Sequence, residues 1–254
     1  MLAEVLTENI FVFLTVFARI GAAMMLMPPF GDTFILRRTR LSLALAVSLV
    51  IMPVAAPALP ALPPGPIALT LILAGEIAVG LFIGGLARVV FSGLHTASLL
   101  VAYNTGLATA SLFAPGQDEH GVMVSRFFTM TALVLLFATD LHQALLLALA
   151  ESYEVLPLAG LPPVGDFAEQ ALDFISGAFV VAVQVAAPLL IAGLLLWVGF
   201  GLLARLMPTM QVFFVALPLQ IAFGFWVLMI ALPGMMLWYF DYFEESIGRL
   251  LVAG

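Results

Sequence analysis

Residues 174–204 read FISGAFVVAVQVAAPLLIAGLLLWVGFGLLA, a mainly apolar stretch without a charged side chain. Leu41–Gly75 and Leu206–Phe240 are also free of charge. A helix needs about 20 apolar residues to cross the hydrocarbon core of a bilayer, and each of these stretches is longer than that. The sequence therefore predicts a membrane protein, or a chain that is buried in an equally apolar partner surface.

The composition agrees with this prediction and excludes several classes of function. Of the 254 residues, 64% are hydrophobic and 9% are charged, whereas a soluble domain has about 25% charged residues. Cysteine is absent, which excludes a disulfide, a thiolate nucleophile and a cysteine-based metal site. The formal net charge is −7, so the chain has no basic face for phosphates and we expect no nucleic-acid partner.

The hydrophobic pattern predicts an all-α, polytopic membrane protein with about six long helical segments. Pro188, Pro218 and Pro233 lie inside the last two segments, and we expect kinks there because proline removes a backbone donor. The six segments cover Ile10–Met27, Leu41–Met52, Ile67–Ala87, Val122–Leu149, Phe174–Ala204 and Val212–Phe240.

Four charged residues are candidates for intramembrane or inter-subunit polar contacts: Arg19, Glu76, Arg88 and Arg205. A charge in the middle of a membrane helix costs about 2.5–3.5 kcal/mol on insertion scales, so it normally faces protein or water. These residues could line a polar pathway or form an inter-helix pair such as Arg19 with Glu76, and the structural pair is the favoured interpretation. Glu76 and Arg88 lie about 18 Å apart on one helix and do not predict a pair. The GLFIG pattern of Gly80–Gly84 permits close helix approach.

The segment 106–121 differs from every other connector. It is rich in apolar and small residues and is interrupted by Pro115 and Gly116, so it is too broken for a span and too apolar for a solvated loop. Irregular backbone at membrane depth persists only where protein buries it or where it lines a cavity. We therefore expect a re-entrant or plugging element, with a packed apolar loop as the alternative.

Nothing in the sequence predicts a catalytic or cofactor site. No glycine-rich phosphate loop, HExxH or GxSxG motif is present. Asp140 and His142 are two residues apart, so they point to different helix faces and do not predict a metal site. We expect neither enzymatic activity nor a cofactor or metal.

A series of short motifs, in order over nearly the whole chain, resembles the FliR family. The bulky Phe113 within FAPG of the broken segment belongs to the series, as does RLSLALA after the first connector. The motifs lie at Phe17–Gly21, Met25–Gly31, Arg40–Ala46, Gly75–Ile77, Gly80–Gly84, Phe113–Gly116, Glu151–Pro157, Gly201–Pro208, Gln211–Phe214 and Leu217–Ile221.

The resemblance implies a core component of the type III protein export gate, located in the bacterial inner membrane at the flagellar basal body. FliR-like proteins assemble with FliP-like and FliQ-like subunits into a helical channel complex, with an FlhB-like subunit at its cytoplasmic face. Exported rod, hook and filament proteins would pass through this pore. Overall motif similarity favours a flagellar system over an injectisome.

The resemblance also implies a division of this single membrane unit and a role for its broken segment. Residues 1–160 correspond to a FliP-like part, and residues 161–254 to a FliQ-like helical hairpin. The segment 106–121 corresponds to the loop that plugs the closed channel. Its expected plug residues are Gly106, Leu107, Leu112, Phe113, Ala114, Pro115 and Gly116.

The main alternative function is a secondary transporter for a small solute or a proton. Broken hydrophobic segments and the intramembrane charges Arg19 and Glu76 favour it. The absence of two matching hydrophobic halves in the sequence argues against it. An intramembrane enzyme is a more distant alternative, because no catalytic set is positioned by the sequence.

Overall fold

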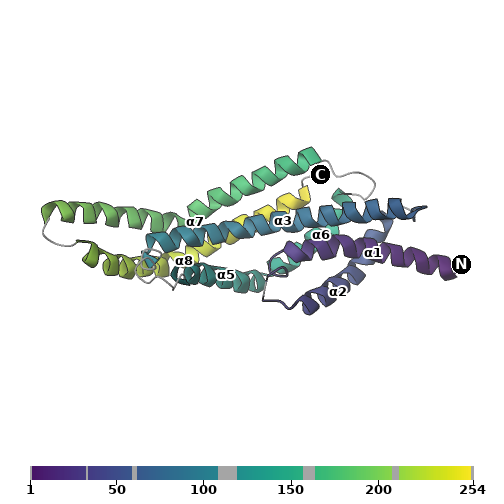
Figure 1. The fold of residues 1–254 in the computed structure, drawn as a ribbon, viewed down its shortest axis with the longest axis horizontal. Coiled ribbons are helices and arrows are strands. Elements are labelled where there is room, and N and C mark those ends of the chain that lie inside the picture. The colour runs from purple at the N-terminus through teal and green to yellow at the C-terminus, as the bar shows by residue number, and fades with distance from the viewer. Residues whose placement is uncertain are drawn as a thin grey trace. The chain divides into compact units, whose positions relative to one another are not determined.

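The chain folds into helices, and the part that the structure describes contains no strand (Figure 1). A computed structural model describes residues 2–32, 34–58, 62–107, 119–156, 164–207 and 212–252. The helices are α1 (Leu2–Leu26), α2 (Arg37–Ala55), the short 3₁₀ helix η1 (Ala56–Ala58), α3 (Pro66–Asn104), α5 (Glu119–Ala138), α6 (Leu141–Val155), α7 (Val164–Leu206) and α8 (Val212–Val252).

These helices confirm the predicted all-α, polytopic membrane fold. Among the described residues, five helices are long and apolar enough to cross a membrane, and the count rises to six if the bent pair α5 and α6 forms one span. Proline begins α3 at Pro66, where its missing N–H has no partner to lose. The three internal prolines that we expected to disturb α7 and α8 lie within continuous helices.

Two predicted segment boundaries are wrong. The segment Val122–Leu149 is not one helix, because α5 and α6 meet at Asp140 with a bend of 72°. Asp140 has a φ of 58°, a left-handed conformation that aspartate tolerates better than most residues and that ends an α-helix. The segment Ile67–Ala87 is too short, because α3 continues through Arg88 to Asn104.

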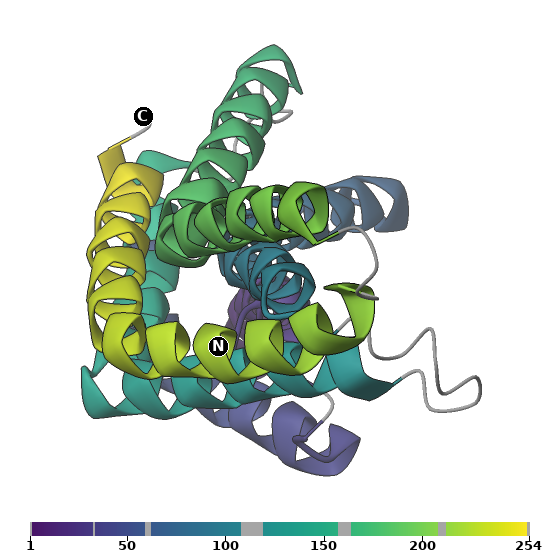
Figure 2. The ribbon, with the colours of Figure 1, turned by 90° about the vertical axis from the view of Figure 1, so that its left-hand side faces the viewer.

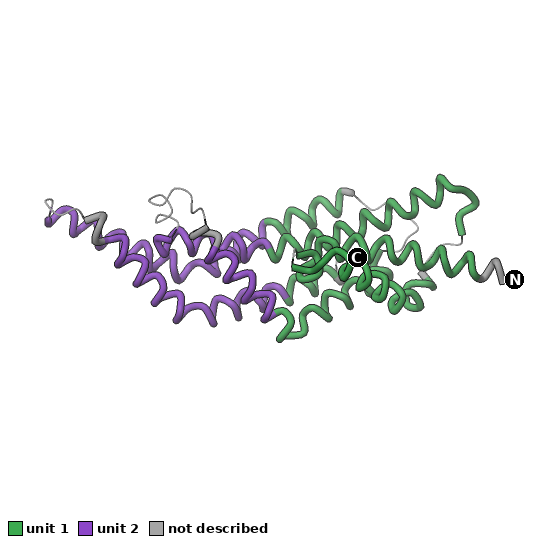
Figure 3. Tube along the Cα trace, turned by 60° about the horizontal axis from the view of Figure 1, so that its bottom comes forward, with its two compact units in different colours: residues 1–91, 136–175, 244–254 green, residues 92–135, 176–243 purple. Residues whose placement is uncertain are grey.

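The chain divides into two compact units (Figure 3). Unit 1 comprises residues 1–91, 136–175 and 244–254, and unit 2 comprises residues 92–135 and 176–243. In unit 1, α1 packs against α2, and Ile20, Met24 and Leu149 are buried. In unit 2, Phe128 and Tyr239 are buried. Each unit therefore combines segments that are far apart in the sequence.

Candidate functional site

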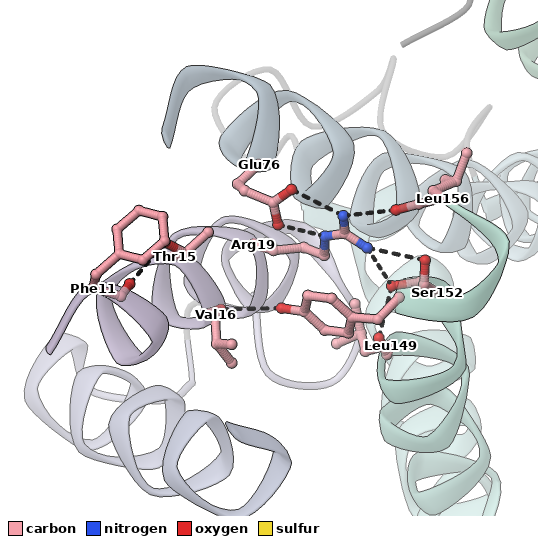
Figure 4. Close-up of polar contacts among 9 residues, drawn as sticks. Phe11, Thr15, Val16, Arg19, Glu76, Leu149, Ser152 and Leu156 are labelled. Atoms are coloured by element: carbon pink, nitrogen blue, oxygen red, sulfur yellow. Dashed lines mark hydrogen bonds and ion pairs between the residues drawn. The ribbon is translucent and has the colours of Figure 1, made fainter. Parts of the chain in front are cut away.

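The most heavily bonded polar group that the structure describes is a buried arginine in unit 1. Arg19 lies on α1 with none of its surface exposed. Its Nε donates to Glu76 Oε2 at 2.7 Å and its Nη2 donates to Glu76 Oε1 at 2.9 Å, as Figure 4 shows. The predicted pair of Arg19 with Glu76 is therefore present, in the two-pronged geometry that makes arginine–carboxylate pairs strong.

The remaining donors of Arg19 satisfy the end of another helix. Nη1 donates to the carbonyl oxygen of Ser152 at 2.9 Å and to its Oγ at 3.2 Å, and Nη2 donates to the carbonyl oxygen of Leu156 at 3.0 Å. These carbonyls belong to the last turn of α6 and the residue just after it, where a helix leaves acceptors unpaired and where its dipole favours a cation. All five N–H groups of the guanidinium thus have acceptors.

An aromatic ring covers the guanidinium. The Cζ of Arg19 lies 4.1 Å from the centre of the Tyr153 ring, within the range of a cation–π contact. The Tyr153 hydroxyl donates to the carbonyl oxygen of Val16 on α1 at 3.4 Å. This ring ties α6 to α1 and contributes to the complete burial of Arg19.

Two glycines let α3 approach α1 closely enough for this pair to form. A Cβ added at Gly80 would collide with the carbonyl oxygen of Arg19, and one added at Gly84 would collide with the backbone of Ala23. The two residues are one helical turn apart on the same face as Glu76. The GLFIG pattern therefore serves the close helix approach that the sequence predicts.

A second ion pair in unit 1 is much more exposed. Arg88 Nη1 lies 2.6 Å from Asp32 Oδ1, and the side chain of Arg88 is 47% exposed whereas that of Asp32 is 10% exposed. Arg40 Nη2 donates to the carbonyl oxygen of Asp32 at 2.8 Å. Arg205 is exposed in the last turn of α7, where a cation suits the helix dipole.

The structure describes both ends of the predicted segment 106–121, and residues 119–121 belong to the helix α5 and not to an irregular loop. Gly106 has a φ of 75° and follows the end of α3, a position where helices often end with a left-handed glycine. Leu107 lines an apolar pocket of about 430 Å³ in unit 2. The other predicted plug residues lie outside the described residues: Leu112, Phe113, Ala114, Pro115 and Gly116.

This arrangement can hold helices together, but it offers no reactive group. Arg19 and Glu76 bind each other through two hydrogen bonds and both side chains are buried, so neither lines a water-filled path in unit 1. In the described ranges, no three His, Asp or Glu residues come together as a metal site would require. The geometry corresponds to the structural interpretation of the Arg19–Glu76 pair.

Sequence reasoning missed the partners that are backbone groups or lie in irregular segments. Ser152 and Leu156 bind Arg19 mainly through carbonyl oxygens, and a carbonyl carries no signal in the residue type. Asp32 lies in the proline- and glycine-containing connector after α1, and a single acidic residue beside three arginines is the only signal that could have predicted its pairing.

Comparison with known proteins identifies relatives over nearly the whole chain. Residues 10–246 match the model of a family described as bacterial export proteins, family 1. The flagellar biosynthetic protein FliR of Caulobacter vibrioides is 35% identical over 93% of this chain and 94% of its own length. That of Aquifex aeolicus is 30% identical over 67% of this chain and 66% of its own length. The Yop proteins translocation protein T of Yersinia pestis is 35% identical over 66% of this chain and 65% of its own length.

Proposed function

The chain belongs to the bacterial export proteins, family 1, together with the FliR proteins that its motifs resemble, and we propose that it is a structural component of a type III protein export apparatus. With FliP-like and FliQ-like subunits it forms a pore for unfolded rod, hook and filament proteins, and an FlhB-like subunit binds nearby. The complex lies in the bacterial inner membrane at the flagellar basal body, and this chain carries out no chemical reaction.

The main support is the extent of the relationship to flagellar proteins. The Caulobacter vibrioides relative is named for flagellar biosynthesis and aligns with almost all of both chains. A protein of the Yop translocation system aligns with about two thirds of each chain at the same identity. An export component of the flagellar type accommodates both relationships.

The length of the apolar helices supports assembly with other subunits. On α3, Ile67 is 77% exposed and Tyr103 is 66% exposed, and about 54 Å of helix separates them. A helix tilted by 40° needs only about 39 Å of its length to cross a hydrocarbon core about 30 Å thick. The apolar surface beyond that length needs another apolar environment, which neighbouring subunits supply.

The arrangement of the C-terminal residues fits the proposed division of the chain. Within 161–254, the described helices are α7 and α8, each longer than 40 residues, and two consecutive helices are compatible with a FliQ-like helical hairpin. Residues 1–160 contain the other described helices and form the FliP-like part. Both parts contribute helices to each compact unit.

The surroundings of the loop 106–121 suit a seal. Leu107 at the start of the loop and Met123 and Val124 just after it line the same apolar pocket in unit 2. Phe225 and Leu228 of α8 complete much of its wall. A closed export channel must block ions, and apolar surfaces that exclude water provide such a block. We propose that the loop plugs the channel and that Phe113 is its bulkiest obstruction.

The plug is tested by measuring the resting conductance of the assembled complex in planar bilayers. We expect Phe113→Ala, and more strongly deletion of 107–115, to increase the conductance at least severalfold while FliP-like and FliQ-like subunits still copurify. Phe34→Ala is the matched control, because Phe34 is an exposed phenylalanine of unit 1. Unchanged resting conductance in correctly assembled deletion complexes would remove the plug from the proposal.

The transporter alternative loses its main support. The intramembrane charges that favoured it, Arg19 and Glu76, are bound to each other and buried. Solute uptake by proteoliposomes that contain this chain alone would be needed to restore that alternative.

A further inference from the structure

The end of α3 in unit 2 has a partner for each of its last carbonyl groups. A helix leaves its final four carbonyls without partners inside the helix. Thr105 N donates to Val101 O at 2.9 Å, Thr105 Oγ1 to Ala102 O at 3.1 Å, and Gly106 N to Tyr103 O at 3.3 Å. Among the described residues, local groups thus bind the carbonyls of Val101, Ala102 and Tyr103, which leaves that of Asn104, the last residue of the helix.

A side chain from α8 satisfies the remaining carbonyl. Gln220 Nε2 donates to the carbonyl oxygen of Asn104 at 3.0 Å, although the two residues are 116 positions apart. Gln220 is only 3% exposed, and its amide is the donor that the described residues provide for the Asn104 carbonyl. An unpaired buried carbonyl is costly, particularly in a membrane protein.

Glycines on α7 and α8 bring both helices against this turn. A Cβ added at Gly224 of α8 would lie 2.9 Å from Thr105 Cα, and one added at Gly193 of α7 would lie 2.5 Å from Asn104 Oδ1. Figure 2 shows α7 and α8 crossing on opposite sides of the end of α3. The turn Asn104–Gly106 is therefore held from two sides by close contacts and from α8 by a hydrogen bond.

We propose that Gln220 is a positioning residue that fixes the turn Asn104–Gly106, and thereby the point from which the loop 106–121 leaves α3. The inference rests on the proposed function of that loop as a seal. The hydrogen bond acts on the last residue of α3, two residues before the loop begins.

The test uses the complex with FliP-like and FliQ-like subunits in planar bilayers and compares three variants. Gln220→Met keeps the length of the side chain and removes its donor. Gln184→Met is the matched control, because it makes the same change at an exposed glutamine of α7 in the same unit. Deletion of 107–115 reports whether the loop seals at all. We expect Gln220→Met to raise resting conductance about three- to tenfold, less than the deletion does, and Gln184→Met to leave it unchanged.

A disulfide distinguishes positioning from general damage. The chain contains no cysteine, and a Cβ at position 193 would lie 3.5 Å from the Cβ of Asn104, within the range that a disulfide spans. Adding Asn104→Cys and Gly193→Cys to Gln220→Met should suppress the leak when the complex is oxidised, and reduction should restore the leak.

The outcomes separate this inference from the function on which it rests. If the deletion leaks and assembled Gln220→Met complexes do not, Gln220 does not position the loop and the plug remains. If the deletion does not leak, the proposed plug itself is wrong. If Gln220→Met prevents assembly, Gln220→Asn replaces it in the test, because the shorter side chain places the amide out of reach of the Asn104 carbonyl. We expect complexes with Gln220→Asn to leak in the same way. Resting conductance equal to wild type in that variant would also contradict the inference.

Discussion

The two units each use one buried side chain to satisfy the end of a helix from a distant part of the chain, but the two side chains differ in charge. In unit 1, Arg19 binds the carbonyls of Ser152 and Leu156 at the end of α6. In unit 2, Gln220 binds the carbonyl of Asn104 at the end of α3. The first is a cation held by a carboxylate and an aromatic ring, and the second is a neutral amide.

This difference indicates how firmly each helix end is held. Removal of one partner of a buried ion pair costs about 3–5 kcal/mol, because the other charge is left without a partner. Removal of a neutral donor leaves one carbonyl unpaired and costs about 1–3 kcal/mol. We therefore expect Arg19, the anchor of unit 1, to hold its helix end more firmly than Gln220, the anchor of unit 2, holds its own.

The largest expected effect is that of Arg19→Met. This change keeps an unbranched apolar stem, removes the guanidinium and leaves the carboxylate of Glu76 buried without a cation. We expect a loss of about 3–5 kcal/mol, seen as a lower yield and a lower melting midpoint of the detergent-solubilised complex. The decrease should exceed that of Gln220→Met measured in the same way. Fluorescence-detected size-exclusion chromatography after heating measures both.

Arg205→Met is the matched control for this experiment, because it removes the same charge from an exposed position in α7. We expect its melting midpoint to remain within about 1 °C of wild type, as for most surface substitutions. A larger loss from Gln220→Met than from Arg19→Met would reverse the comparison between the two units.

A second, smaller effect is expected from filling the space at Gly80 that lets α3 approach the Arg19–Glu76 pair of unit 1. Gly80→Ala places a methyl group against the carbonyl oxygen of Arg19, and such overpacking costs about 1–3 kcal/mol. Gly75→Ala is the control on the same helix, since a Cβ there meets nothing within 4 Å. The control should stabilise the helix by up to about 1 kcal/mol. Equal melting midpoints for the two variants would show that the close approach contributes nothing to the anchor.

The sequence predicted the pair at the centre of unit 1 because a charge in an apolar helix requires an opposite charge, and few candidates exist in so apolar a chain. The all-α fold followed from charge-free stretches longer than a span. The sequence did not predict that the ends of α6 and α3 are the other partners, because backbone carbonyls are the same in every residue. It also failed at Asp140, where one left-handed residue divides an apolar segment that has no proline or glycine at the break.

The limits of α3 show a further reason for failure. The predicted segment ended at Ala87, next to the charged Arg88, but Arg88 reaches Asp32 outside the helix, and the helix continues. A charge marks the end of an apolar segment only when it has no partner to reach. The two glycines Gly75 and Gly80 show the same kind of failure. Gly80 contacts α1 and Gly75 does not, but the sequence pattern alone does not distinguish them.

The smallest expected effect comes from the second ion pair of unit 1, between Arg88 and Asp32. This pair carries the same charges as Arg19 and Glu76 but is more exposed, so it tests whether charge or burial determines the strength of an anchor. Arg88 is 47% exposed and lies 2.6 Å from Asp32, so water and salt screen the pair, and such pairs contribute about 0.2–1 kcal/mol. We expect Arg88→Met to lower the melting midpoint by a small fraction of the shift caused by Arg19→Met, and to do so less in 0.5 M salt than at low salt, because salt screens the exposed pair. If Arg88→Met destabilised the complex as strongly as Arg19→Met, the strength of an anchor would follow from its charge alone, and burial would not account for the difference between Arg19 and Gln220.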